Sequence, residues 1–453
     1  MNSTGQTTAN EALSANVLDT RFEDFDDATI EHTKNRFIDL IGCVILGANE
    51  PDNLALVDLV KNWGGKEEAT ILVHGVKAPA QNVAMVNNII ARSFDFEMHD
   101  PFVEGKVLNG HTSATTVMTA VTMGEATGIG GKELITALLV GDNVACRIQA
   151  ARSMEAPRSG LASGNAMFGA TAIAGRLLGL NKLQMRNAFG ITLNHVSPFG
   201  MQSTSDKTNC FKFQNGTAAR NGIFSAELAK AGWTGAEDPF LGLNVEILTR
   251  NLGKNYYADA NFKAYPCCRG THMLVQCTLT LVAKHAIDPE EIEEVTIYAI
   301  NPLPIPAGLE KPFGIGSFPH CRAIYSYQYT VANALLRKSV KPEHFVDEAI
   351  SDPKVNALIS KTKVEIRELP GKERGAEIKV RMKDGRELSE FNENERGDTL
   401  MDPLSKEEII AKFRANVAFS QTVTKENAEK VLGLLEKLEE LDNLNKLVKL
   451  LVV

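Results

Sequence analysis

The sequence contains none of the short motifs that mark a dedicated metal or redox site. Its seven cysteines include no C-x-x-C pair, and none of its nine histidines lies in an H-E-x-x-H motif. An odd number of cysteines spread along a long chain is typical of reduced thiols rather than of a disulfide framework. A zinc site would therefore need histidines that are far apart in the sequence, and we expect no metal.

Positive charge and long apolar runs are also lacking. Lysine and arginine number 48 against 56 acidic residues, and the resulting charge of -8 argues against a nucleic-acid-binding protein. The first residues, MNSTGQTTANEAL, lack the basic start and apolar segment of a signal peptide. Runs such as ELITALLVG and LVKLLVV are shorter than the about 20 residues of a membrane-spanning helix. We therefore predict a cytoplasmic protein that binds neither nucleic acid nor membrane.

What is present indicates two structural regions. A chain of 453 residues is long enough for two domains, which can be interleaved in the sequence. From about residue 10 to 250 the apolar spacing is helical, and many Ala and Gly residues favour closely packed helices. Three later stretches alternate apolar and polar residues as strands do, and Asp384-Gly385 predicts a hairpin between two of them. The strand-like stretches are EEVTIYAI (293–300), KVEIREL (363–369) and AEIKVRMKDGRELSEF (376–391).

The stretch FKAYPCCRGTH (262–272) concentrates reactive side chains around one proline. Pro266 disfavours helix at the residue before it, and a helix can then start among the cysteines. Cys268 and His272 would share a face of that helix, and its free N–H groups with Arg269 and Lys263 would suit a carboxylate. The alternative is that His272 is a core histidine and the cysteines only fill space.

A second cluster lies in SFDFEMHDPFVEGKVLNGHTSATT (93–116). Asp95, His99 and His111 lie around a loop that ends at a helix start, which Thr112 or Ser113 can cap. A carboxylate such as Asp95 can orient a histidine and select one ring tautomer, as acid–base catalysis requires. The alternative is a solvated loop that happens to hold two histidines.

A third stretch, TSDKTNCFKFQNG (204–216), places Lys207 and Lys212 before a helix start. A lysine there can bind a carboxylate as a point charge. Because surface lysines are common, this stretch alone indicates little.

Together these stretches resemble the MmgE/PrpD family over nearly the whole chain. SFDFEMHD is similar to the family's D-F-D-D-T, GHTSA to H-P-S-A, and FKAYPCCRGTH to K-x-Y-P-x-C-x-x-T-H. AIYSYQYTVANALL is similar to F-S-x-x-Y-x-V-A-x-A-L, and MDPLSKEEIIAKF to N-P-x-S-x-E-E-x-x-x-K-F. The family includes 2-methylcitrate dehydratases, cis-aconitate decarboxylases and an iminodisuccinate epimerase.

The resemblance implies a mainly α fold with a large all-helical domain and an inserted smaller α+β domain. Residues 1–258 would form the first part of the helical domain, 259–397 the α+β lid domain, and 398–453 the C-terminal helices that return to the first part. The site would lie in the cleft between the domains. The resemblance also implies a homodimer and a reaction without a metal or organic cofactor.

The resemblance further implies a set of site residues. Carried over position by position, it implies Asp95, His111, Lys263, Cys268, His272 and Tyr329. We expect Asp95, His111, Lys263, His272 and Tyr329 to be catalytic, and His99, Lys212, Cys268 and Arg269 to bind substrate. Three positions depart from the family pattern: Ser163 stands where many members have a histidine, His99 replaces a threonine, and Lys212 lies one residue later than the usual lysine.

Our hypothesis is a dehydratase-type lyase acting on a small hydroxy-di- or tricarboxylate such as 2-methylcitrate. His111, held by Asp95, would move the proton next to a carboxylate, and His272 and Tyr329 would help the hydroxyl leave. Lys263, Arg269 and Lys212 would bind carboxylates. The alternatives are an epimerase, which needs two opposed bases, a decarboxylase, and a homologue that binds carboxylates without catalysis.

Overall fold

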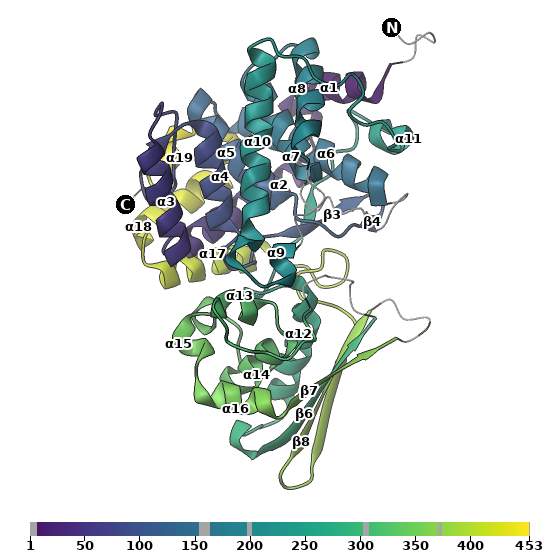
Figure 1. Ribbon diagram of the computed structural model, residues 1–453, viewed down its shortest axis with the longest axis vertical. Coiled ribbons are helices and arrows are strands. Elements are labelled where there is room, and N and C mark those ends of the chain that lie inside the picture. The colour runs from purple at the N-terminus through teal and green to yellow at the C-terminus, as the bar shows by residue number, and fades with distance from the viewer. Residues whose placement is uncertain are drawn as a thin grey trace.

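The structure, a computed structural model, is mainly α, as predicted. It describes residues 7–153, 164–196, 202–301, 308–368, 370 and 374–452. Figure 1 shows an upper body of packed helices and a lower body in which short helices lie against a twisted sheet. The two ends of the chain both belong to the upper body, and the middle of the chain forms the lower one.

The upper body consists of helices from both ends of the sequence. Those of the first part are α1 (Ala9–Asp19), α2 (Asp27–Gly47), α3 (Pro51–Trp63), α4 (Ala80–Ala91), α5 (Ser113–Thr127), α6 (Gly131–Ser153), α7 (Gly164–Leu177), α8 (Lys182–Thr192), α9 (Gln202–Ser205), α10 (Phe213–Lys230) and α11 (Val245–Thr249). Those of the tail are α17 (Lys406–Ser420), α18 (Lys425–Glu436) and α19 (Asn445–Val448). Short 3-10 turns η1 (Phe22–Asp24), η2 (Leu193–His195), η3 (Asn209–Lys212) and η6 (Leu438–Glu440) connect them.

Small residues let these helices approach closely, as the composition predicts. A Cβ atom built on Gly141 of α6 would lie 2.8 Å from the backbone oxygen of Gly169 in α7. A Cβ on Gly42 of α2 would lie 3.2 Å from the Phe413 ring of α17. The tail helix α17 is therefore packed directly on a helix near the start of the chain.

Helix α6 is more apolar than the short runs in its sequence indicate. Its stretch Gly131–Arg152 is long and apolar enough to cross a membrane by length and composition. However, 94% of its most apolar window is buried inside the molecule, as in the core helix of a packed bundle.

A small sheet at the base of the upper body positions two site segments. Strand β3 (His99–Val103) pairs antiparallel with β4 (Lys106–Val107) and with β5 (Asp259–Asn261). In this register His99 lies opposite Asn261, two residues before Lys263. The segment that contains Asp95 and the segment that contains Lys263 therefore meet. A separate antiparallel pair, β1 (Ala69–Thr70) and β2 (Lys77–Ala78), packs against α4.

The lower body has a four-stranded sheet in the order β7-β6-β8-β9, with β6 and β7 parallel and the other pairs antiparallel. The Asp384-Gly385 hairpin is confirmed, with Gly385 at a φ of 86°. The strands are β6 (Ile292–Ile300), β7 (Thr362–Arg367), β8 (Gly375–Met382) and β9 (Glu387–Asn392). The helices are α12 (Arg269–Lys284), α13 (Pro319–Ile324), α14 (Tyr327–Arg337), α15 (Asp347–Ile350) and α16 (Pro353–Ser360), with turns η4 (Pro289–Glu291) and η5 (Pro342–His344).

Candidate active site

Four charged side chains form a buried cluster where β3 begins. Arg92, at the end of α4, pairs with both Asp95 and Glu97. Lys263, which follows β5, brings its Nζ to 2.6 Å from Asp95 Oδ1 and 2.6 Å from the Asp95 backbone oxygen. Asp95 itself has a φ of 47°, in the left-handed region that residues other than glycine adopt uncommonly. The cluster therefore holds its backbone in a strained turn, as functional sites often do.

His111 joins this cluster through Glu97, not through Asp95. Its Nδ1 atom lies 3.1 Å from Glu97 Oε1. The expectation that Asp95 orients His111 is therefore wrong, because Arg92 and Lys263 occupy the Asp95 carboxylate. Sequence reasoning missed Glu97, although it lies two residues after Asp95 in the stretch SFDFEM, where a second carboxylate was a visible signal.

The electrostatics of the cluster favour a neutral histidine beside ionised carboxylates. Burial by itself would raise the pKa of Asp95 and of Glu97, but the Arg92 and Lys263 cations outweigh it and lower both. Burial and the Arg92 charge lower the pKa of His111 to about 4, although Glu97 acts in the opposite direction. The His111 side chain is 30% exposed, whereas that of Glu97 is fully buried. At neutral pH His111 is thus an accessible neutral base.

A second histidine–carboxylate pair lies beside the first. His99 Nδ1 is 3.2 Å from Asp100 Oδ2, and Asp100 also pairs with Arg269 at the start of α12. Arg269 Nε lies 2.7 Å from Glu395 Oε1 as well. Burial would raise the pKa of Asp100, but the Arg269 charge lowers it. The rings of His99 and His111 lie with their centroids 6.0 Å apart and their planes at 49°.

The start of α5 is already capped by the protein. Asp259 Oδ2 lies 2.7 Å from the Ser113 backbone nitrogen and accepts its hydrogen bond. The prediction that Thr112 or Ser113 supplies the capping side chain is wrong, since no side chain of the preceding residue bonds there. Burial raises the pKa of Asp259 to about 8, and the Ser113 amide opposes that rise.

The start of α12 lies where the sequence predicts it, with Cys268 as the residue that precedes the helix. His272 Nε2 lies 3.2 Å from the Cys267 backbone oxygen, and its ring centroid lies 5.3 Å from that of Tyr265. Burial lowers the pKa of His272 to about 3 and raises that of Cys268 to about 12. Both groups are therefore neutral at physiological pH, and Cys268 is a thiol rather than a thiolate.

Lys212 does not reach this cluster. Its Nζ lies 2.8 Å from Asp52 Oδ2 and 2.8 Å from Asn53 Oδ1, so its charge is already paired. The expectation that Lys212 is free to bind substrate is corrected on this ground. Lys207 differs: its Nζ donates to the backbone oxygens of Gly308 (3.3 Å) and Tyr325 (2.8 Å), which belong to the lower body.

Tyr329 also lies away from the cluster. Its hydroxyl donates to the His344 backbone oxygen, and its ring lies among those of Phe313 and Phe345. Burial raises its pKa to about 12. Its predicted role at the leaving hydroxyl is therefore corrected.

A different tyrosine, Tyr325, is close enough to the cluster for its charges to act on it. Burial raises the pKa of Tyr325, and the charges of Asp95 and Arg92 also affect it. Ser163, the other position of interest, lies outside the described residues.

One group of side chains in the described part of the chain approaches metal-ligand spacing. The ligand atoms of Asp95, Glu97 and His111 lie within 4.8 Å of one another. Arg92 contacts both carboxylates and Lys263 contacts Asp95, so the protein's own cations already balance their charge. A divalent ion would have to displace these cations, and we assign no metal ligands here.

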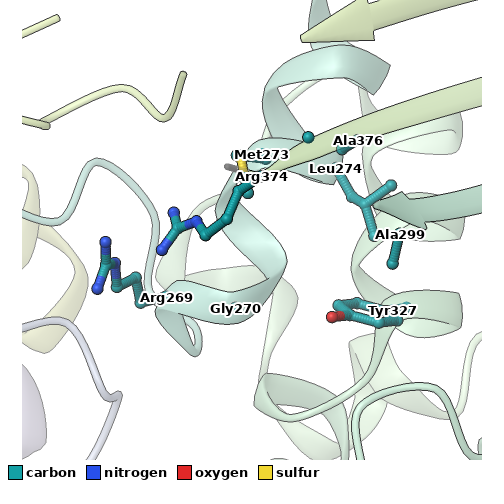
Figure 2. A pocket seen from close by; sticks show the side chains of 9 residues that line it. Arg269, Gly270, Met273, Leu274, Ala299, Tyr327, Arg374 and Ala376 are labelled. Atoms are coloured by element: carbon teal, nitrogen blue, oxygen red, sulfur yellow. The ribbon is translucent and has the colours of Figure 1, made fainter. Parts of the chain in front are cut away.

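Figure 2 shows a small pocket beside the second pair, in which the side chains of Arg269 and Arg374 lie near each other. Both contact Glu395 Oε1, Arg269 at 2.7 Å and Arg374 at 3.4 Å. The pocket has a volume of about 10 Å³, which holds about one water molecule. It is therefore too small for a carboxylic acid substrate.

Family models match this chain over both bodies. The MmgE/PrpD N-terminal domain matches residues 11–244 and the MmgE/PrpD C-terminal domain matches residues 265–437. The chain belongs to the MmgE/PrpD family. Among its relatives in this family, the cis-aconitate decarboxylase of Homo sapiens is 25% identical, over 93% of this chain and 91% of the relative.

Two fungal relatives have similar coverage. The cis-aconitate decarboxylase of Aspergillus terreus is 24% identical, over 91% of this chain and 90% of the relative. A cis-aconitate decarboxylase-like protein of Aspergillus oryzae is 22% identical, over 96% and 95%. Over more than nine tenths of its length, this chain is thus similar to proteins named for one reaction of the family.

Proposed function

We propose that this MmgE/PrpD protein is a cofactor-independent lyase that moves a proton on a carbon next to a carboxylate of a small di- or tricarboxylate. The observation that carries the proposal is the His111–Glu97 pair. Because the Glu97 carboxylate faces Nδ1 at 3.1 Å, it favours the tautomer with hydrogen on Nδ1 and leaves Nε2 free to accept a proton. A positioned base of this kind contributes about 10²- to 10⁴-fold to the rate.

Dehydration of a hydroxy acid such as 2-methylcitrate is our first candidate, because it needs a base and an acid together. His111 would take the proton from the α-carbon, and the electron pair of that C–H bond would form the new C=C bond. The C–O bond would break, and a proton from His99 would let the hydroxyl leave as water. The two rings contact each other, with their centroids 6.0 Å apart, so a substrate would lie across both rings and not between them.

The second candidate is decarboxylation, which the names of the relatives favour. Loss of CO₂ leaves a carbanion that needs one proton donor, and a single histidine can supply it. The two pairs of this chain thus favour dehydration, while its family relatives favour decarboxylation.

Binding of the substrate would need positive charge beyond the pairs described above. Arg92 and Lys263 balance Asp95 and Glu97, and Arg269 and Arg374 balance Asp100 and Glu395. Lys207 donates to backbone oxygens, which do not neutralise it, so it is our candidate for binding a substrate carboxylate. We further propose that the part of residues 259–397 that follows Lys263, which forms the lower body, closes over the site as a lid, and that the protein is a homodimer.

The test is proton NMR of the purified protein in deuterated water with 2-methylcitrate, citrate, malate, cis-aconitate and iminodisuccinate. New vinyl signals from a hydroxy acid would establish dehydration, and replacement of the cis-aconitate vinyl signal by those of a product with one carboxylate fewer would establish decarboxylation. Exchange at the α-carbon without elimination would instead indicate an epimerase. Tight binding without any exchange would contradict the proposal and indicate a non-catalytic homologue. Native mass spectrometry of the same sample tests the dimer.

A further inference from the structure

A lysine of the C-terminal helix α17 reaches the back of the His111 cluster. The side chain of Lys412 is 7% exposed, and its Nζ lies 2.6 Å from Asp39 Oδ1. The same Nζ donates to the backbone oxygen of Phe96 at 2.6 Å and to that of Lys263 at 3.0 Å. One ammonium group from the tail of the chain therefore binds both segments that build the cluster.

Asp39 of α2 completes this arrangement. Its Oδ2 accepts a hydrogen bond of 3.0 Å from the Met98 backbone nitrogen. Phe96 and Met98 are the two neighbours of Glu97 in the sequence. The ion pair thus holds the backbone on both sides of the carboxylate that contacts His111. The Lys412 ammonium also lies 3.7 Å from the centre of the Phe96 ring, a cation–π contact that restrains the same residue.

We propose that Lys412 and Asp39 are a positioning pair for the proton-transfer site. They fix the position of Glu97 relative to His111. They also fix the position of Lys263, because its backbone oxygen accepts a hydrogen bond from the same Lys412 ammonium. This inference rests on the proposed function only in taking His111 as the base. Neither residue is a catalytic residue, because both act through the backbone of Glu97 and Lys263.

Loss of this ion pair is expected to lower the reaction rate, because it would displace the groups that act on the proton. A displacement of about 1 Å at a reacting group can cost about 10²-fold in rate. Three hydrogen bonds to backbone groups of the site converge on one buried ion pair, so its loss releases both segments together. A buried ion pair with a purely structural role could be replaced by neutral side chains with little effect on the site.

The first experiment measures turnover of the substrate found by the NMR panel. Lys412→Met alone leaves the Asp39 carboxylate buried without its cation, so the double variant Asp39→Asn/Lys412→Met, which leaves no lone charge, is measured beside it. We expect the double variant to fold and to lose about 10²-fold in kcat, with little change in KM. Lys406→Gln is the matched control, since Lys406 lies on the same helix and its carboxylate contacts are at 3.5 and 3.6 Å near the surface.

The second experiment needs no substrate. With ¹³C-labelled histidine, an NMR titration follows the His111 ring, and the His111→Asn variant assigns its signal. Glu97 raises the pKa of His111, while Arg92 and Lys263 lower it. Release of the segments that carry Glu97 and Lys263 therefore shifts the pKa of His111 in the double variant, and Lys406→Gln leaves it unchanged.

The outcomes separate this proposal from the proposed function. A folded double variant that keeps the wild-type kcat or the wild-type pKa of His111 overturns the positioning role. If the His111 pKa shifts in the double variant but the wild-type protein turns over no acid in the panel, the positioning role stands and the proposed lyase activity fails.

Discussion

The two histidine–carboxylate pairs differ in which parts of the molecule complete them. His111 and Glu97 both come from the upper body, and the cations around them lie at the end of α4 and directly after β5. His99 and Asp100 also come from the upper body, but the cation that holds Asp100 is Arg269 of α12. The first pair thus needs only the upper body and its sheet. The second is complete only when the lower body is in place, so the proposed closure of the lower body would bring the proposed acid, His99, beside the proposed base, His111.

The largest expected effect comes from breaking the first pair. His111→Asn should lower kcat by about 10²- to 10⁴-fold, because it removes the group that moves the proton. Steady-state kinetics on the substrate from the NMR panel measures the loss. His285→Asn is a suitable control, since His285 is an exposed histidine at the end of α12. Full turnover by the His111 variant would refute its role.

The next effect comes from breaking the second pair at the interface. Arg269→Met leaves Asp100 and Glu395 buried without their main cation, and loss of one partner of a buried ion pair costs about 3–5 kcal/mol. Chemical denaturation should therefore show a lower free energy of unfolding. Hydrogen exchange should show that amide protection is lost in α12 and kept in α4. An equal loss of protection in both helices would contradict the conclusion that only the second pair depends on the lower body.

A smaller effect concerns the pH dependence of stability. The pKa of Asp259 is about 8 in the folded protein and about 4 in an unfolded chain, so the folded state binds more protons between these values. Its contribution to stability is present at low pH and is lost as pH rises towards 8. The lowered pKa of His111 acts oppositely, but only between about 4 and about 6.5, so it does not mask the Asp259 effect above that range.

We therefore expect thermal stability to fall between pH 6.5 and pH 8 in the wild-type protein, and Asp259→Asn to reduce that fall. Differential scanning calorimetry at several pH values measures it. An identical slope in both proteins would mean that Asp259 is ionised in the folded state.

The smallest effect on activity is expected at Tyr329. Tyr329→Phe removes a hydroxyl that bonds to the His344 backbone oxygen, so it should lower stability by about 1–3 kcal/mol and leave kcat nearly unchanged. Tyr325→Phe is the informative counterpart, because the charges of Asp95 and Arg92 act on Tyr325. If Tyr329→Phe lowered kcat more than Tyr325→Phe, the assignment of the two tyrosines would be reversed.

Local patterns predicted the elements of this protein well. The alternating stretches became β6, β7, β8 and β9, and the Asp384-Gly385 turn lies between the last two. Pro266 preceded a helix start at the expected place. Periodicity and turn chemistry act over a few residues, so the sequence alone shows them. The family-like stretches also contain Asp95, His111, Lys263 and Arg269, which the structure places in one region.

The sequence by itself determined the kinds of element, the mainly α fold and the family. Only the tertiary structure decided which charged groups meet. Glu97 rather than Asp95 contacts His111, Lys212 pairs with Asp52, and Lys412 from the tail binds the segment around Glu97. These pairings join residues up to 316 positions apart. They depend on which groups are buried and on the distances between packed elements, and a local sequence pattern contains no information about either.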